Sequence, residues 1–288
     1  MIYIFTALYS EASLLIRQFH LTKNLENTRF QEFYNETAGI RLTVTGVGEI
    51  AAASAVSSVC TAYRPAQEDI LLNIGTCACA CRTENGGIFL CNKIMEHATG
   101  KTFYPDLLFQ HEFYERMLVT KMTPYQYVEN DNMLTVYPEE TLYDMEAAAV
   151  YQAGSYFFSP HQMIFIKLIS DRGMPDQMSN DEVIHIMENV QNKLFGFITR
   201  LREIAAAYLH TTSGFDQELE DLVKILCNDL HCSKVMGDSL RQYVHYFALS
   251  GTDVGAVAQQ MYAEGLLPCK DKREGKKSFE ELKRRLLE

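Results

Sequence analysis

The stretch Tyr143-Asp144-Met145-Glu146-Ala147-Ala148-Ala149, followed downstream by Ile169-Ser170-Asp171, is the most informative part of this chain. Met145 and Glu146 stand near the start of an expected alanine-rich helix, and the Ser-Asp pair ends an apolar run typical of a buried strand. The carboxylate of Glu146 can bind two vicinal hydroxyls of a ribose, and the thioether of Met145 can lie against the sugar. Asp171, at the carboxyl end of a strand, is placed to protonate a leaving base. The two segments therefore predict a protein that holds a nucleoside and cuts its glycosidic bond.

Strand-like and helix-like runs alternate outward from these segments over residues 1–210. The expected strands cover residues 2–7, 40–45, 70–74, 87–92, 134–137 and 163–170. The expected helices begin with Ser10 as a cap, at Glu49, at Pro138 (the helix carrying Met145 and Glu146) and at Asn180, the last ending near Leu209. This alternation predicts a three-layer α/β/α fold with a central mixed sheet, in which ligands bind at the carboxyl ends of strands.

The remainder of the chain shows only helical patterns. Residues 211–214, Thr-Thr-Ser-Gly, are typical of a linker, and three amphipathic stripes follow. We therefore expect a catalytic domain over residues 1–210 and an all-helical appendage over residues 215–288. The lysines and arginines from Lys270 onward alternate with acids, which indicates a solvated helical end.

Charge and composition exclude several classes of protein. The chain has 288 residues and a formal net charge of −11, which argues against binding to nucleic acid or to a membrane surface. The apolar start, residues 1–8, is too short for a signal or a membrane span, so we expect a cytoplasmic protein. The alternating Cys77, Cys79 and Cys81 are expected to be reduced, buried thiols, and we expect no metal site. Residues 46–51 fit the relaxed dinucleotide fingerprint, but no acid stands at the far end of the next strand, so no organic cofactor is expected.

Five segments in order give the chain a resemblance to the purine nucleoside phosphorylase and uridine phosphorylase superfamily, and within it to the 5′-methylthioadenosine/S-adenosylhomocysteine nucleosidases. They span residues 7–11, 45–53, 73–76, 144–149 and 169–171. The resemblance implies that Glu146 and Met145 hold the ribose and that Asp171, positioned by Ser170, protonates the purine. It further implies that Glu11 activates the attacking water.

The same resemblance suggests further substrate-binding residues. They are Gly48, Gly75 and Thr76 in the turns and strand ends, Lys167, and a tyrosine stacking on the base, for which Tyr104 is our choice beside Tyr125 and Tyr127. Family nucleosidases carry an arginine at the position of Lys167, and lysine keeps the charge without the bidentate fork. The segment between residues 87 and 121, which helps to form the dimer interface in typical family members, is shorter here. Whether this chain forms a homodimer is therefore left open.

Charge also separates hydrolysis from phosphorolysis. A phosphate nucleophile needs arginine clamps, whereas this chain has Asn73 where family phosphorylases have arginine, and Glu11 where phosphate would be repelled. We therefore expect hydrolysis of 5′-modified adenosines, namely methylthioadenosine, S-adenosylhomocysteine or 5′-deoxyadenosine, with release of adenine. Two alternatives remain: a phosphorylase of the same superfamily, and a non-catalytic nucleoside-binding subunit whose C-terminal helices dock a partner protein.

Overall fold

The computed structural model describes residues 1–26, 29–79, 87–126, 137, 140–173 and 178–287, with only the backbone for residues 207–217. The chain divides into two compact units, Met1–Ala206 and Ala207–Glu288. No described helix combines the length and the apolar character that crossing a membrane requires.

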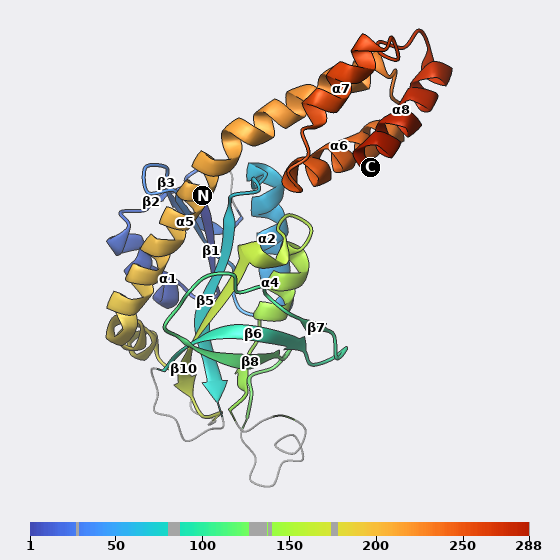
Figure 1. Ribbon diagram of the computed structural model, residues 1–288. Coiled ribbons are helices and arrows are strands. Elements are labelled where there is room, and N and C mark those ends of the chain that lie inside the picture. The colour runs from blue at the N-terminus through green and yellow to red at the C-terminus, as the bar shows by residue number, and fades with distance from the viewer. Residues whose placement is uncertain (27–28, 80–86, 127–136, 138–139, 174–177, 288) are drawn as a thin grey trace. The chain divides into compact units, whose positions relative to one another are not determined.

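One mixed sheet of ten described strands forms the centre of the first unit (Figure 1). The strands are β1 (Ile2–Thr6), β2 (Thr22–Lys23), β3 (Gln31–Asn35), β4 (Ile40–Val44), β5 (Ile70–Cys79), β6 (Ile88–Glu96), β7 (Thr102–Phe103), β8 (Tyr114–Thr120), β9 (Leu142–Asp144) and β10 (Met163–Asp171). Parallel pairs join β4 to β1, β1 to β5 and β5 to β10, so the carboxyl ends of these four strands meet at one edge.

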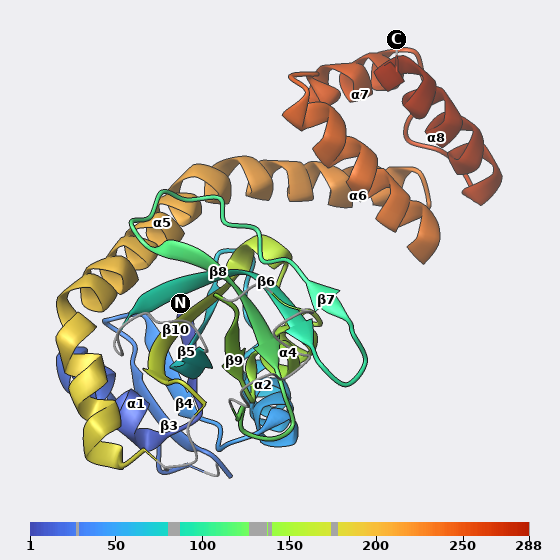
Figure 2. The same cartoon turned by 90° about the horizontal axis from the view of Figure 1, so that it is seen from below.

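Five of the strands close into a ring, which can be followed in Figure 2. β5 is long enough to pair with β10 along most of its length and with β9 at its last residues. β10 also pairs with β6, β6 with β8, and β8 with β9, which returns to β5. The ring brings the end of β9, and the residues that follow it, next to the ends of β5 and β10.

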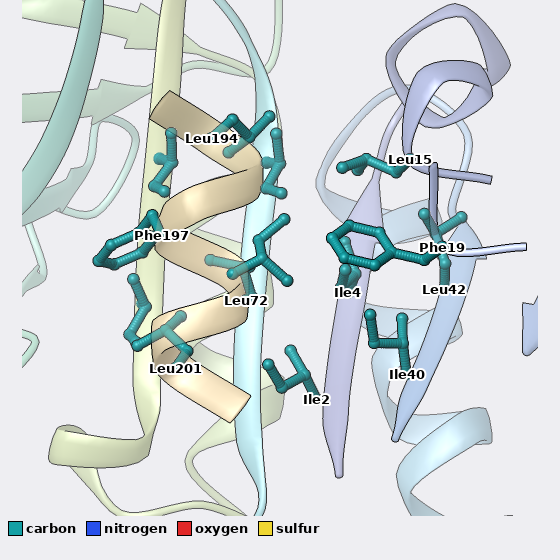
Figure 3. Packing of buried hydrophobic residues seen from close by; sticks show 14 of the residues in the cluster. Ile2, Ile4, Leu15, Phe19, Ile40, Leu42, Leu72, Leu194, Phe197 and Leu201 are labelled. Carbon is teal, nitrogen blue, oxygen red and sulfur yellow. The ribbon is translucent and has the colours of Figure 1, made fainter. Parts of the chain in front are cut away.

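Helices cover both faces of the sheet, as the sequence predicted for a three-layer fold. α1 (Tyr9–Gln18) and the first part of α5 (Asn180–Asp229) pack on one face, and α2 (Glu49–Tyr63) and α4 (Ala147–Gly154) on the other (Figure 1). Because side chains alternate along β1, Ile2 and Ile4 face α1 and α5 whereas Tyr3 and Phe5 face α2 and α4. Figure 3 shows the first of these cores, with Leu194, Phe197 and Leu201 of α5 lying over Leu72.

The helix predicted to open at Pro138 and to carry Met145 and Glu146 is wrong in its start. Residues 142–144 form β9, Glu146 is the N-cap, and the helix begins at Ala147; Pro138 itself lies outside the described residues. Leu142 and Tyr143 are buried by pairing with β5 and β8, which outweighs the helical pattern of the apolar residues. The consequence is that Met145 and Glu146 lie in the turn between a strand and a helix.

Two further boundaries differ from the sequence prediction. The N-cap of α1 is Leu8 rather than Ser10, whose buried hydroxyl has no hydrogen-bond partner. β5 continues to Cys79, so Gly75 and Thr76 lie within the strand rather than beyond its end. The predicted strand at residues 134–137 lies, except for Tyr137, outside the part of the chain that the structure describes.

The second unit contains only helices within its described residues, as predicted. The end of α5, α6 (Lys234–Leu249), α7 (Val254–Ala263) and α8 (Lys272–Leu287) surround a core of their own, in which Leu226, Leu240, Val244, Met261 and Leu282 are fully buried. The segment predicted as a linker, residues 211–214, is helical, because α5 continues through it and does not end near Leu209. Helix propagation from well-packed flanks outweighs the weak propensity of four residues.

The cysteine prediction holds in part. Cys77 is a buried free thiol, whereas Cys79 is disulfide-bonded; Cys81 lies outside the described residues. Burial raises the pKa of the Cys77 thiol well above its usual value, so this thiol stays protonated.

Candidate active site

A cavity of about 350 Å³ opens at the carboxyl ends of β1 and β10, beside the end of β5. Its described lining comprises Ala7, Leu8, Glu11, Val47, Thr76, Cys77, Ala78, Pro124, Tyr125, Gln126, Tyr143, Asp144, Met145, Glu146, Ser170, Asp171 and Met178. Four of these side chains are carboxylates, and none is a lysine or an arginine. The cavity wall is therefore suited to a neutral or cationic molecule rather than to an anion.

Glu11 reaches the cavity from the first turn of α1 and is almost fully buried, with 1% of its surface exposed. Its Oε2 accepts hydrogen bonds from the backbone N–H groups of Ala7 and Leu8, each at 3.0 Å. Its Oε1 accepts from the N–H and the hydroxyl of Thr76, at 2.7 and 2.9 Å. Four donors therefore fix the carboxylate in place. Glu11 is the third residue of α1, a position from which a glutamate side chain can reach back to the N–H of the cap residue, Leu8.

Glu146 enters from the start of α4. As the N-cap it makes no side-chain hydrogen bond to its own helix, and its Oε1 instead accepts from the N–H of Gly48 at 2.8 Å. Gly48 has a φ of 97°, a conformation that only glycine adopts readily, and it begins α2. Burial, followed by the neighbouring Asp144 carboxylate, raises the pKa of Glu146 to about 7.

Asp171 is the last residue of β10 and is partly exposed to the cavity. Its Oδ1 accepts a hydrogen bond from the N–H of Gly173 at 2.7 Å. The hydroxyl of Ser170 lies 2.8 Å from Oδ2 and 3.1 Å from the carbonyl oxygen of Cys77. Contacts on both carboxylate oxygens orient this group while leaving it accessible.

Lys167 lies behind the wall of the cavity rather than in it. Its side chain is 1% exposed, and its ammonium is 2.9 Å from Oδ2 of Asp144. Burial lowers the pKa of the ammonium, but the carboxylates of Asp144, Glu146 and Glu11 outweigh that effect and raise it above the usual value. Lys167 is therefore a fixed positive charge beneath three carboxylates of the site.

The predicted site residues fall into three groups. Glu11, Thr76, Met145, Glu146, Ser170 and Asp171 line the cavity together. Gly48, Gly75 and Lys167 support lining residues from behind: a Cβ on Gly75 would lie 3.3 Å from both Oε1 of Glu11 and Nζ of Lys167. Tyr104 is not part of the cavity; it is 58% exposed, and its carbonyl oxygen accepts from Tyr151.

Two tyrosines that do line the cavity are Tyr125 and Tyr143. Their rings are stacked, with centroids 4.0 Å apart and planes 6° from parallel. Tyr125 was an alternative to Tyr104 in the sequence, whereas Tyr143 was not identified because it was expected inside a helix. Tyr127 lies outside the described residues.

Asp144 and Thr120 also escaped the sequence analysis. Asp144 was visible as the first acid of an Asp-x-Glu pair, but nothing in the sequence joins it to Lys167. Thr120 ends β8 far from every motif. Its hydroxyl donates a hydrogen bond to Asp144, and the two residues meet only because β8 pairs with β9. In the described residues, no group of three or more His, Cys, Asp or Glu side chains is arranged to hold a metal ion.

Comparison with solved structures identifies the fold. The 5′-methylthioadenosine/S-adenosylhomocysteine nucleosidase of Neisseria meningitidis, solved with methylthio-immucillin-A, matches with a TM-score of 0.56 and 19% identity over 69% of this chain and 97% of its own. The 5′-methylthioadenosine nucleosidase of Arabidopsis thaliana matches with a TM-score of 0.55 and 19% identity, over 68% and 95%. A nucleosidase of Colwellia psychrerythraea, solved with adenine, gives 0.53 and 17%, over 70% and 95%.

The chain thus has the nucleoside phosphorylase-like fold, in the form found in the methylthioadenosine/S-adenosylhomocysteine nucleosidases, and the predicted resemblance is confirmed for the fold. No protein-family model matches the sequence. No curated protein matches it either.

Proposed function

We propose that this protein hydrolyses the N-glycosidic bond of 5′-modified adenosines and releases adenine. The observation that carries the proposal is one cavity lined by Glu11, Glu146 and Asp171 and free of lysine and arginine in its described lining. Several of the structural neighbours were solved with methylthio-immucillin-A, adenine or methylthioadenosine, which supports a nucleoside of this kind.

Ribose binding is assigned to Glu146 and Met145. The carboxylate of Glu146 has one oxygen engaged by Gly48, which leaves lone pairs for the two vicinal hydroxyls of a ribose. Met145 is half-buried beside it in the cavity wall, where its thioether can pack against the sugar ring.

Departure of the base is assigned to Asp171. As the N-glycosidic bond breaks, electrons move into the purine, and a proton delivered to its N7 makes adenine a neutral leaving group. Ser170 and Gly173 orient the carboxyl without closing it off. The positive charge that develops on the ribose is stabilised by the carboxylates around it.

The nucleophile is assigned to water held by Glu11. All of roughly four lone-pair sites of this carboxylate are engaged by protein donors, so one donor must turn away before Glu11 can accept a proton from water. The hydroxyl of Thr76 is the donor that can rotate, and Thr76 lines the cavity. Phosphate has no cation among the described lining residues, which favours water.

The test is chromatography of adenine released from methylthioadenosine, S-adenosylhomocysteine and 5′-deoxyadenosine, with and without phosphate. The expected result is release of adenine without phosphate, together with the free 5-modified ribose. Release only with phosphate, together with a ribose 1-phosphate, would make the protein a phosphorylase. Tight nucleoside binding without turnover, plus a partner recovered with the C-terminal helices, would instead identify a binding subunit.

A further inference from the structure

The start of α4 is capped by neighbouring elements rather than by its own N-cap residue. The first free N–H of the helix, that of Ala147, donates to Oδ2 of Asp144 at 2.8 Å, and the next, that of Ala148, donates to the hydroxyl oxygen of Thr120 at 2.9 Å. The hydroxyl of Thr120 donates in turn to Oδ1 of Asp144 at 2.7 Å. Glu146, which occupies the N-cap position, is thereby released from capping.

This arrangement depends on a buried ion pair. Asp144 and Lys167 have side chains that are 0% and 1% exposed, and the ammonium contacts the same oxygen that caps Ala147. A buried carboxylate without a counter-charge is strongly destabilising, so the ammonium is needed to keep Asp144 in this position. Lys167 therefore holds Asp144 where it can accept from the N–H of Ala147.

The same ammonium is also close to Glu11. A Cβ on Gly75 would lie 3.3 Å from Nζ of Lys167 and 3.3 Å from Oε1 of Glu11. Both groups therefore pack against β5 at the position where it has no side chain. The titratable groups facing the ammonium are the carboxyls of Asp144, Glu146 and Glu11 and the thiols of Cys77 and Cys91, while Glu49 of α2 faces Asp144. Both thiols have raised pKa values and stay neutral. The ammonium lowers the pKa of the Glu146 carboxyl.

We propose that Lys167 is a positioning residue for ribose recognition: its buried ammonium holds Asp144 against the start of α4 and thereby directs Glu146 into the cavity beside Glu11. The inference rests on the proposed function only in taking Glu146 as the ribose ligand. It assigns Lys167 no contact with the substrate.

The test measures binding of two C-nucleoside analogues of adenosine, whose carbon–carbon bond is not hydrolysed, to the full-length chain. One analogue carries both ribose hydroxyls and the other is its 2′,3′-dideoxy form. Lys167→Met should weaken binding of the hydroxylated analogue about tenfold or more at neutral pH, the worth of one charged hydrogen bond, and leave the dideoxy analogue unchanged. The acid limb of hydroxylated-analogue binding should move to higher pH, because the ammonium lowers the pKa of the Glu146 carboxyl and its removal lets that carboxyl hold its proton more tightly.

Matched variants separate charge from position. Lys167→Arg keeps the charge and should leave the acid limb in place, whereas Thr120→Val removes a capping group and should weaken ribose binding without moving that limb. Lys193→Met, on the exposed side of α5, should change neither the binding of the hydroxylated analogue nor the position of the acid limb. Equal weakening of both analogues by Lys167→Met would indicate a purely structural role and overturn the inference.

Two other outcomes would also overturn it: unchanged binding of the hydroxylated analogue to Lys167→Met, and a wild-type protein that does not distinguish or does not bind the two analogues. The proposed function is tested by a different measurement. Absence of adenine release by the wild-type protein would contradict the proposed function and would leave the binding comparison unaffected.

Discussion

Burial sets the charge of Glu146, and this has consequences for both binding and stability. The pKa of about 7, caused mainly by desolvation and by Asp144, means that the carboxylate is fully formed only in mildly alkaline solution. We expect nucleoside affinity to rise as the pH increases through about 7 and then to level off. Affinity that falls over this range in a binding titration would contradict ribose recognition by ionised Glu146.

The stability effect of the same residue has the opposite sign. A carboxyl whose pKa is raised in the folded state favours folding when protonated, so its contribution is lost as the pH rises from the unfolded value of about 4.5 through about 7. Glu146→Gln should therefore increase the free energy of unfolding at pH 8 by about 1–3 kcal/mol while abolishing ribose binding. Urea unfolding at pH 5 and pH 8 checks this, because the gain should largely vanish at the lower pH.

Asp171 offers a cleaner separation of chemistry from structure. Asp171→Asn keeps an oxygen to accept from Gly173 but has no proton to give, so adenine release should fall about 10²–10⁴-fold with the fold and the Michaelis constant little changed. Steady-state kinetics and circular dichroism test both parts. Wild-type turnover in this variant would show that the proton comes from elsewhere.

At the scale of elements, local signals were sufficient where a segment's own pattern decides its structure. The helix predicted to begin at Glu49 is α2, Glu49–Tyr63, because the glycine turn before it marks its start. The start of α4 was not, because Leu142 and Tyr143 become a strand only by pairing with β5 and β8. Because Tyr143 was expected inside a helix, the sequence analysis did not identify it as a residue that lines the cavity.

The turn that begins α2 links backbone conformation to the site. Gly48 combines a φ of 97° with open space around its Cα, so Gly48→Ala should act through backbone strain alone, at about 1–3 kcal/mol. Because the N–H of Gly48 binds Glu146, relief of that strain should also raise the Michaelis constant. Kinetics and thermal unfolding measure the two effects.

Gly39 supplies the matched control for this turn. It too has a positive φ, 64°, and open space, but it lies in the β3–β4 connection away from the cavity. Gly39→Ala should destabilise the fold, by about 1 kcal/mol, and leave the Michaelis constant unchanged. If both variants raise it equally, the contact between Gly48 and Glu146 is not what matters.

For the whole molecule, the sequence predicted residues that come together in one cavity because each of its five motifs is local. Glu11, Glu146 and Asp171 each end or begin an element, and an α/β sheet gathers such positions at one edge. The Lys167–Asp144 pair could not be found in this way, because its members are 23 residues apart and meet only once the ring of strands has closed (144 to 167). The helical structure of residues 211–214 was missed for a different reason: their composition is typical of a loop, but the helix on either side continues through them.

All described site residues belong to Met1–Ala206, so a lesion confined to the second unit separates the roles of the two units. Gly275 of α8 is buried against the backbone of Leu230, and a Cβ there would overlap the Leu230 carbonyl group. Gly275→Ala should therefore force α8 away from the end of α5 and destabilise the second unit by about 1–3 kcal/mol or more. Hydrogen exchange should rise in α6, α7 and α8, while adenine release stays at the wild-type rate. Gly196→Ala, at an exposed helical position of α5 with open space, should instead stabilise its helix by about 1 kcal/mol. If Gly275→Ala slows adenine release, the helical unit contributes to catalysis and the two units do not work independently.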